Sequence, residues 1–330
     1  MALPVNRTSP PGGPAERTPW EFLLAVAAAT GAFVYLLAVV AGHMVPDSTG
    51  AGTRAAGTGG SAGHLVDASR AAGPSSGDQA AALEAAIRAV LTTDEAASTG
   101  VAVMTPGGEW LGGLNPDLPG YAASTFKLAI LLEAERRVSA GVLSYTDRIP
   151  VTDEARAEDL GTIDRLPVAP DGTVSLGEAL EAMITFSDNA SAVALLRFLG
   201  PGEIDASLRA LGAERFSVND PGLPTTARDL ALVLAAIARG EGMSAAQRDH
   251  ALELLTAQEV RAGIPAALDG MPDVLRVGNK TGTWPGATRD AALVETESGA
   301  YVIAVMSEGD WNWELVRRVA RAVHDQLTVR

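Results

Sequence analysis

The sequence predicts an α/β (α+β) protein with one antiparallel sheet of about five strands flanked by helices, plus a separate lobe made only of helices. Two observations indicate this class: strand patterns occur at both ends of residues 80–330, and the stretch between them is helical. If an early hairpin joins the late strands, a single sheet forms and the middle helices make a second lobe. A cleft between two such lobes is a natural place for a site.

The early part of this region predicts a helix followed by a hairpin. Residues 81–91 place apolar side chains on one side of a helix. Residues 100–104 and 109–111 then flank a Pro-Gly-Gly sequence, which is typical of a β-hairpin. These two strands are the ones expected to join the late strands.

The middle part contains three helix starts. One helix is expected from about Ser124 and is closed by Gly141. A second begins at the capping-box pattern Ser175-Leu-Gly-Glu178. A third begins at Thr226 and ends at Gly240, so the middle of the chain supplies the helical lobe.

The late part predicts three successive strands and a closing helix. The strands are expected over residues 276–283, 290–295 and 300–306, and the helix over residues 311–327. This helix and the early one are expected to cover the sheet.

The N-terminal part predicts a membrane anchor. Residues 22–42 form a run of 21 residues without a charge, which as a helix reaches roughly 30 Å and crosses a bilayer core. Arg7 and Arg17 precede the run and place the segment 1–21 inside the cell. The rival interpretation is a cleaved signal peptide, but the apolar part of such a peptide is usually about 7–15 residues long.

A linker is expected to separate the anchor from the folded domain. Residues 43–79 are rich in Gly, Ala, Ser and Thr, a composition that buries too little surface to offset the entropy of ordering. We therefore expect a flexible tether and, over residues 80–330, a catalytic domain outside the membrane. The domain would be secreted if the apolar run is cleaved.

Composition limits the partners and the chemistry. The net charge of −15 argues against nucleic acid, because phosphate binding needs clustered Lys and Arg. The absence of cysteine excludes disulfides, thiolate nucleophiles and Cys-based zinc sites. The four histidines are widely scattered, so no metal and no cofactor is predicted. His250 and His324 fall in helical stretches and are predicted at the surface, which disfavours a Ser-His-Asp triad.

The first motif with chemical meaning is Ser124-Thr-Phe-Lys127. Ser124 is expected to open a helix at the positive end of its dipole, with Lys127 one turn on and on the same face. A lysine held dry beside a serine can take its proton and so make the hydroxyl a nucleophile. The plain alternative is a helix-capping serine followed by a solvated lysine.

Two further motifs follow along the chain. Ser187-Asp-Asn189 falls in a short break between two helices, where a loop can project polar side chains, although these residues are also common helix caps. Lys280-Thr-Gly282 lies on a predicted strand, and Gly282 would let the backbone of a ligand approach closely. The alternative for this motif is a strand end that enters the turn at residues 284–286.

Together and in this order, the three motifs resemble those of class A β-lactamases and penicillin-binding proteins, a family of penicillin-recognising serine hydrolases. The stretches around them, residues 122–128, 183–191 and 225–230, resemble the same family. The resemblance covers residues 80–330 and implies a β-lactamase/transpeptidase-like fold.

The resemblance also implies catalytic roles by position. Ser124 attacks a carbonyl carbon and becomes acylated. Lys127 removes its proton directly or through water, Ser187 relays a proton to the leaving nitrogen, and Lys280 supplies positive potential.

The implied substrate-binding residues are neighbours of these. Asn189 binds the amide side chain of the substrate, and the hydroxyls of Thr281 and Thr283 bind its carboxylate beside Gly282. The backbone N–H groups of Ser124 and Thr283 form the oxyanion hole that acyl transfer requires.

One element of the family pattern is missing. Class A β-lactamases carry a Glu-x-x-Leu-Asn element whose glutamate activates the deacylating water. The corresponding stretch, residues 211–226, lacks it and is short; Arg215 stands where the glutamate is wanted. Glu214 and Asp220 are the nearby carboxylates, and each is either a replacement base or a solvated loop residue.

The sequence therefore predicts a hydrolase of the β-lactamase type that forms an acyl-enzyme on Ser124 with β-lactams, with a role in antibiotic response and β-lactam catabolism. Two alternatives stay open: a D-Ala-D-Ala carboxypeptidase or penicillin-binding protein acting on peptidoglycan stem peptides of the cell wall, and a slow-turnover module that binds β-lactams or cell-wall peptides. The expected partners are the substrate and, through the N-terminal helix, the membrane. A monomeric catalytic domain is expected.

Overall fold

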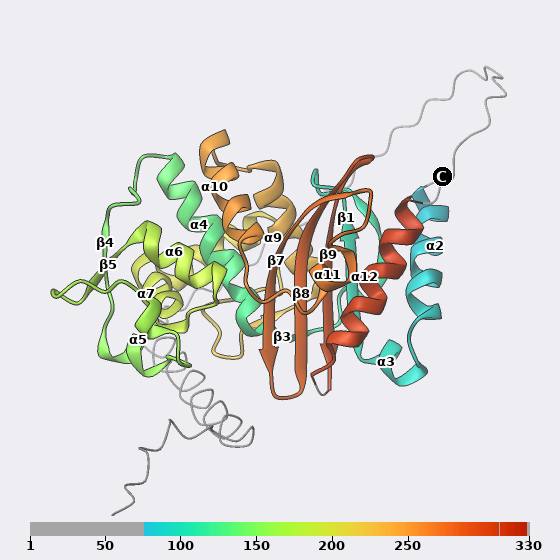
Figure 1. Cartoon of the computed structure of the whole chain (residues 1–330), viewed down its shortest axis with the longest axis horizontal. Coiled ribbons are helices and arrows are strands. Elements are labelled where there is room, and N and C mark those ends of the chain that lie inside the picture. Colours follow the sequence, from blue (N-terminus) through green and yellow to red (C-terminus); the bar gives the residue numbers. More distant parts are fainter. Residues whose placement is uncertain (1–75, 310, 329–330) are drawn as a thin grey trace, which may run out of the picture.

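A computed structural model describes residues 76–309 and 311–328, and its centre is a five-stranded antiparallel sheet (Figure 1). The strand order is β2-β1-β9-β8-β7. The early hairpin joins the late strands through β1 and β9, which pair with Val101 opposite Val305. The predicted sheet is therefore confirmed. The strands are β1 (Thr99–Met104), β2 (Trp110–Leu114), β7 (Val274–Trp284), β8 (Ala287–Thr296) and β9 (Gly299–Glu308).

Helices from both ends of the described chain cover one face of the sheet (Figure 1). Leu83 and Ile87 of the first helix are fully buried in one apolar cluster with Val316 and Val319 of the last helix and Ile303 of β9. The expected cover by the early and the closing helix is present. The helices on this face are α2 (Ser76–Ala89), α3 (Thr93–Ala97), α11 (Ile264–Leu268) and α12 (Trp313–Thr328).

The other face of the sheet packs against the helical lobe (Figure 1). Two short pairs of strands tie its loops: β3 (Gly120–Tyr121) with β6 (Pro224–Thr225), and β4 (Arg148–Pro150) with β5 (Thr173–Ser175). The second lobe expected from the middle of the chain is therefore present. Its helices are α4 (Lys127–Ser139), α5 (Asp153–Ala157), α6 (Leu176–Thr185), α7 (Asn189–Leu199), α8 (Pro201–Ala210), α9 (Ala227–Arg239) and α10 (Ala245–Thr256).

The predicted helix ends have the expected caps. Ser175 and Glu178 form a reciprocal capping box at the start of α6. The Thr226 side chain accepts a hydrogen bond from the Asp229 N–H, and Gly240 ends α9 in the left-handed conformation at φ 69°. These local signals satisfy backbone groups that a helix end leaves unpaired.

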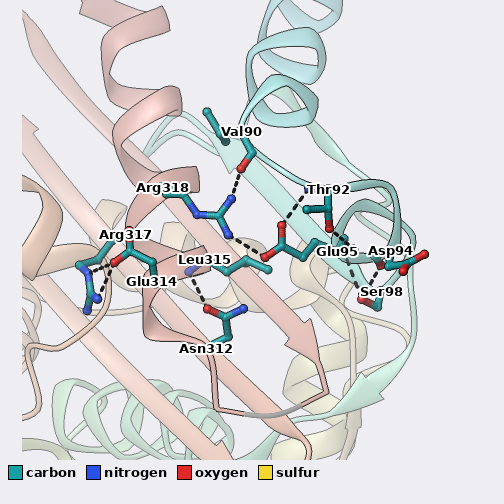
Figure 2. Close-up of polar contacts among 10 residues, drawn as sticks. All are labelled: Val90, Thr92, Asp94, Glu95, Ser98, Asn312, Glu314, Leu315, Arg317 and Arg318. Carbon is teal, nitrogen blue, oxygen red and sulfur yellow. Dashed lines mark hydrogen bonds and ion pairs between the residues drawn. The ribbon is translucent and has the colours of Figure 1, made fainter.

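Figure 2 shows how α12 is fastened to the capped start of α3. The Glu95 side chain accepts a hydrogen bond from the Thr92 N–H at 2.8 Å, and the Arg318 guanidinium donates to the same carboxylate at 2.6 Å. Arg318 also donates to the Val90 carbonyl. One arginine thus links the C-terminal helix to the turn that follows α2.

The prediction that His324 lies at the surface is wrong, whereas His250 keeps part of its side chain exposed. His324 of α12 is fully buried, and its ring nitrogens lie 3.0 Å from the Tyr301 hydroxyl and 3.1 Å from an Asp273 oxygen. His250 is partly buried, and its Nδ1 lies 2.7 Å from a Glu135 oxygen. Polar partners inside the fold offset the cost of this burial, and a helical pattern alone does not show them.

The predicted segments 1–21 and 22–42 lie outside the described residues, as does most of the predicted linker. Residues 76–79, which were expected in the linker, belong instead to α2. Within residues 76–309 and 311–328, none of the helices combines the length and the apolar character needed to cross a bilayer.

Candidate active site

Ser124 lies in a tight turn rather than at the first residue of an α-helix. The 3₁₀ turn Ala123–Phe126 precedes α4, which begins at Lys127. Ala123 has φ 46°, a conformation that costs about 1–3 kcal/mol for a residue with a Cβ. The Ala122 N–H donates to the Leu223 carbonyl at 2.8 Å, which helps to hold this strained turn.

Lys127 joins the first motif to the second. Its side chain is fully buried, and its Nζ donates to the Ser187 carbonyl at 2.7 Å, the Ser187 hydroxyl at 3.1 Å and the Asn189 Oδ1 at 2.8 Å. Ser124, Ser187 and Asn189 themselves remain partly exposed. The amine is thus kept from water while the residues around it can meet a substrate.

Lys280 joins the third motif to the second. Its Nζ donates to the Ser187 hydroxyl at 3.0 Å and to the Thr281 carbonyl at 2.8 Å. The Ser187 oxygen therefore accepts from both lysines, and because a hydroxyl has two lone pairs and one proton, that proton is left to donate elsewhere. We call Ser124, Lys127, Ser187 and Lys280 the acylation cluster.

Burial changes the protonation of both lysines. Burial, and then the charge of Lys280, holds the pKa of Lys127 well below its usual value, while Asp188 opposes the shift. Burial lowers the pKa of Lys280 to about 7, against the opposing charge of Asp290. A lysine that loses its proton in this way can act as a base toward a neighbouring hydroxyl.

The Ser-Asp-Asn loop is held in shape by hydrogen bonds to the Asp188 carboxylate. Ser187 has φ 60°, and Asp188 caps α7 by accepting from the Ser191 N–H at 2.6 Å. The Thr162 hydroxyl donates to the other Asp188 oxygen at 2.6 Å. The capping role expected as the plain alternative therefore belongs to Asp188, while its neighbours contact the lysines.

Gly282 allows strand β7 to lie against the Ser124 turn. A Cβ at this position would stand 3.0 Å from the Ala122 carbonyl oxygen, the Ser124 nitrogen and the Thr125 nitrogen. Real Cβ atoms rarely make such close contacts with backbone, so the position favours glycine. Thr281 is buried, and Thr283, on the same strand, is exposed.

The loop of residues 211–226 places its two candidate carboxylates in solvent. Glu214 and Asp220 are both exposed, and an Asp220 oxygen accepts from the Gly222 N–H at 2.7 Å. Leu223 is fully buried next to the Ser124 turn, to which its carbonyl is bonded. The interpretation of these carboxylates as solvated loop residues fits this geometry.

Sequence reasoning missed three features outside the motifs. Glu158 is a buried carboxyl in the lobe. Tyr121 and Trp284 have ring centroids 5.0 Å apart, and the Trp311 indole N–H donates to the Trp284 carbonyl at 2.8 Å. Trp284 closely follows the third motif and was visible as its neighbour, whereas no motif marks Glu158.

Comparisons with known proteins agree with this geometry. A family model described as "Beta-lactamase enzyme family" matches residues 82–327. β-Lactamase CTX-M-97 of Escherichia coli is 29% identical over 148 residues, which are 41% of this chain and 50% of the relative. The chain spans about half the length of the curated relatives it matches.

Solved structures are similar over most of the chain. A mutant of PBP-A in an acyl-enzyme complex with penicillin G is 26% identical with a TM-score of 0.66, and the match covers 75% of this chain and 96% of that one. A class A β-lactamase of the last common ancestor of Gram-negative bacteria is 26% identical with a TM-score of 0.63, covering 74% and 99%.

Proposed function

The chain belongs to the β-lactamase enzyme family, and we propose that it is a class A-like serine hydrolase that forms an acyl-enzyme on Ser124 and hydrolyses β-lactams. The observation that carries the proposal is the Ser187 hydroxyl, which accepts hydrogen bonds from both Lys127 and Lys280. Three motifs far apart in the sequence meet there, beside the Ser124 turn.

In the proposed acylation step, Lys127 has lost one proton and, with it, one of its three donated hydrogen bonds. Its neutral amine then takes the proton of the Ser124 hydroxyl, directly or through water. The Ser124 oxygen attacks the lactam carbonyl, and the resulting oxyanion is stabilised by the N–H groups of Ser124 and Thr283. The Ser187 hydroxyl gives its proton to the leaving nitrogen as the C–N bond breaks, and its oxygen takes in turn the proton that Lys127 removed from Ser124, across the hydrogen bond of 3.1 Å between them.

The proposed binding residues surround this centre. Asn189 holds the amide side chain of the substrate, while Thr281 and Thr283 bind its carboxylate in the positive potential of Lys280. The closeness of Gly282 to the Ser124 nitrogen supports an oxyanion hole between turn and strand.

A second candidate function is a D-Ala-D-Ala carboxypeptidase or a penicillin-binding module with slow turnover. The observation in its favour is that Glu214 and Asp220 are exposed, so neither is a buried base for deacylation. Similarity to a penicillin-acylated mutant of PBP-A is compatible with this candidate as well.

The location is part of the proposal. We propose that residues 22–42 anchor the chain and that the catalytic domain acts outside the membrane. The charge-free run in the sequence supports it. Protease added to intact cells should remove the domain but leave the N-terminal segment; full protection of the domain would contradict this location.

Intact mass spectrometry of the full-length chain with benzylpenicillin tests the proposed chemistry. A transient adduct with penicillin consumed indicates a β-lactamase, and a lasting adduct indicates the second candidate. Ser124→Ala is the control and should show neither. If the unaltered chain forms no adduct and consumes no penicillin, both candidates fail.

A further inference from the structure

Glu158 is a buried carboxyl that the acylation cluster does not use. It lies at the C-terminal end of α5 and is 2% exposed. Its Oε2 has no hydrogen-bond partner among the described residues. A buried acceptor left without a donor costs free energy, so such a group needs an explanation, and a bound water or substrate is one.

The contacts around α5 direct its C-terminal end toward the Ser-Asp-Asn motif. Arg197, near the end of α7, donates to the Thr152 hydroxyl at 3.3 Å, at the start of α5. Thr162, after α5, donates to Asp188 at the start of α7. The two helices therefore run in opposite directions, and the end of α5 that carries Glu158 lies toward the start of α7.

The negative charge of Glu158 also acts on Tyr121. Burial raises the pKa of Tyr121, and the negative charge of Glu158 adds to the shift. Tyr121 stands three residues before Ser124, on the strand that leads into its turn. The end of α5 that carries Glu158 thus lies toward the start of α7, and the charge of Glu158 acts on a residue close to Ser124 in the sequence.

Other carboxylates around the cluster are less suited to activating water. Asp188 is occupied by the Ser191 N–H and the Thr162 hydroxyl. Asp290 accepts from the Asn279 side chain at 2.9 Å and the Ile264 N–H at 2.8 Å. Glu158 differs from these two in having a buried oxygen that no described residue donates to.

We propose that Glu158 is the general base of deacylation, in place of a glutamate from the loop of residues 211–226. The inference rests on the proposed acyl-enzyme at Ser124. The Glu158 carboxylate takes a proton from a water molecule, and the water oxygen attacks the acyl carbonyl. The bond from that carbon to the Ser124 oxygen then breaks, the serine oxygen receives the proton from Glu158, and the acid product leaves.

The protonation of Glu158 gives this role a pH signature. Burial raises its pKa to about 7, against the opposing charge of Arg197 on α7, and Tyr121 is the titratable group toward the nucleophile. Only the ionised form can accept a proton, so deacylation should accelerate as pH rises through about 7 and level off above it.

The test compares Glu158→Gln with Glu154→Gln in the full-length chain. Gln has nearly the shape of Glu but is no base, and Glu154 is an exposed carboxylate on the same helix. With benzylpenicillin, Glu158→Gln should lengthen the lifetime of the adduct by about 10²–10⁴-fold, leave its rate of formation within about threefold, and lose the rise with pH. Glu154→Gln should match the unaltered chain.

Three results would overturn the role of Glu158 without touching the acyl-enzyme. The first is an unchanged adduct lifetime in Glu158→Gln, and the second is a pH profile of deacylation that keeps its rise in this variant. The third is slower adduct formation together with a lower melting temperature, which would mark Glu158 as a structural carboxyl. If the unaltered chain forms no adduct at all, the proposed function itself fails, and that outcome is separate from the first three.

Discussion

The acylation cluster and the loop of residues 211–226 both adjoin the Ser124 turn, but they differ in how completely their polar groups are engaged. In the cluster, two buried lysines converge on one hydroxyl. In the loop, Glu214 and Asp220 are exposed, and the contact with the turn is the backbone hydrogen bond that the Leu223 carbonyl accepts. This difference agrees with the proposal that the cluster forms an acyl-enzyme and that a residue outside this loop activates the deacylating water.

The largest effect is expected at Lys127, the proposed proton acceptor of the acylation cluster. Lys127→Met removes the amine that accepts the Ser124 proton and should slow adduct formation by about 10²–10⁴-fold. Stopped-flow acylation by a chromogenic cephalosporin measures this rate, and circular dichroism checks the fold. A loss below tenfold in a folded variant would remove Lys127 from the role of base.

The next effect tests the contact between strand β7 and the turn. Gly282→Ala places a methyl group 3.0 Å from the Ser124 nitrogen and should displace an oxyanion donor. Acylation should fall by about 10²–10³-fold. Gly202→Ala is the matched control, because a Cβ there meets nothing within 4 Å. Equal activities in the two variants would contradict the assigned oxyanion hole.

A smaller effect is expected in how the KM and the rate of deacylation depend on pH. Lys280 has a pKa of about 7, so its positive charge is present below that pH and is lost above it. The KM for a carboxylate-bearing substrate should therefore rise as pH increases through about 7, while deacylation accelerates over the same range. Lys280→Arg, which stays charged, should flatten the KM profile; a profile that keeps its slope would contradict this assignment.

The smallest effect is expected in the loop. Glu214→Gln and Asp220→Asn should each leave the adduct lifetime within about twofold, because a solvated side chain is poorly placed to hold a catalytic water. Timed mass spectrometry of each variant measures it. A lifetime lengthened by about 10²-fold in either one would return the deacylating base to the loop.

The sheet and the acylation cluster were predictable because short-range signals specify them. The capping box at Ser175 and the three motifs are visible within a few residues each, and the fold has only to bring them together. The two buried lysines were predicted as site residues, although their shared contact with Ser187 was not.

The burial of His324 and of Glu158 was not predictable, because it depends on contacts between residues far apart in the sequence. His324 is buried because Tyr301 and Asp273 supply partners from elsewhere in the chain. Glu158 follows the short acidic helix α5, whose sequence is typical of a solvent-exposed helix. Only tertiary packing buries the Glu158 side chain. Its place in the helical lobe arises from the packing of α5 along α7.

The most direct test of the central claim is to locate the penicillin adduct. The full-length chain would be mixed with benzylpenicillin, quenched, digested with trypsin and sequenced by tandem mass spectrometry. The acyl group is expected on Ser124, in the peptide that ends at Lys127. An acyl group on any other residue, or penicillin consumed with Ser124 unmodified throughout the time course, would contradict the assignment of the nucleophile.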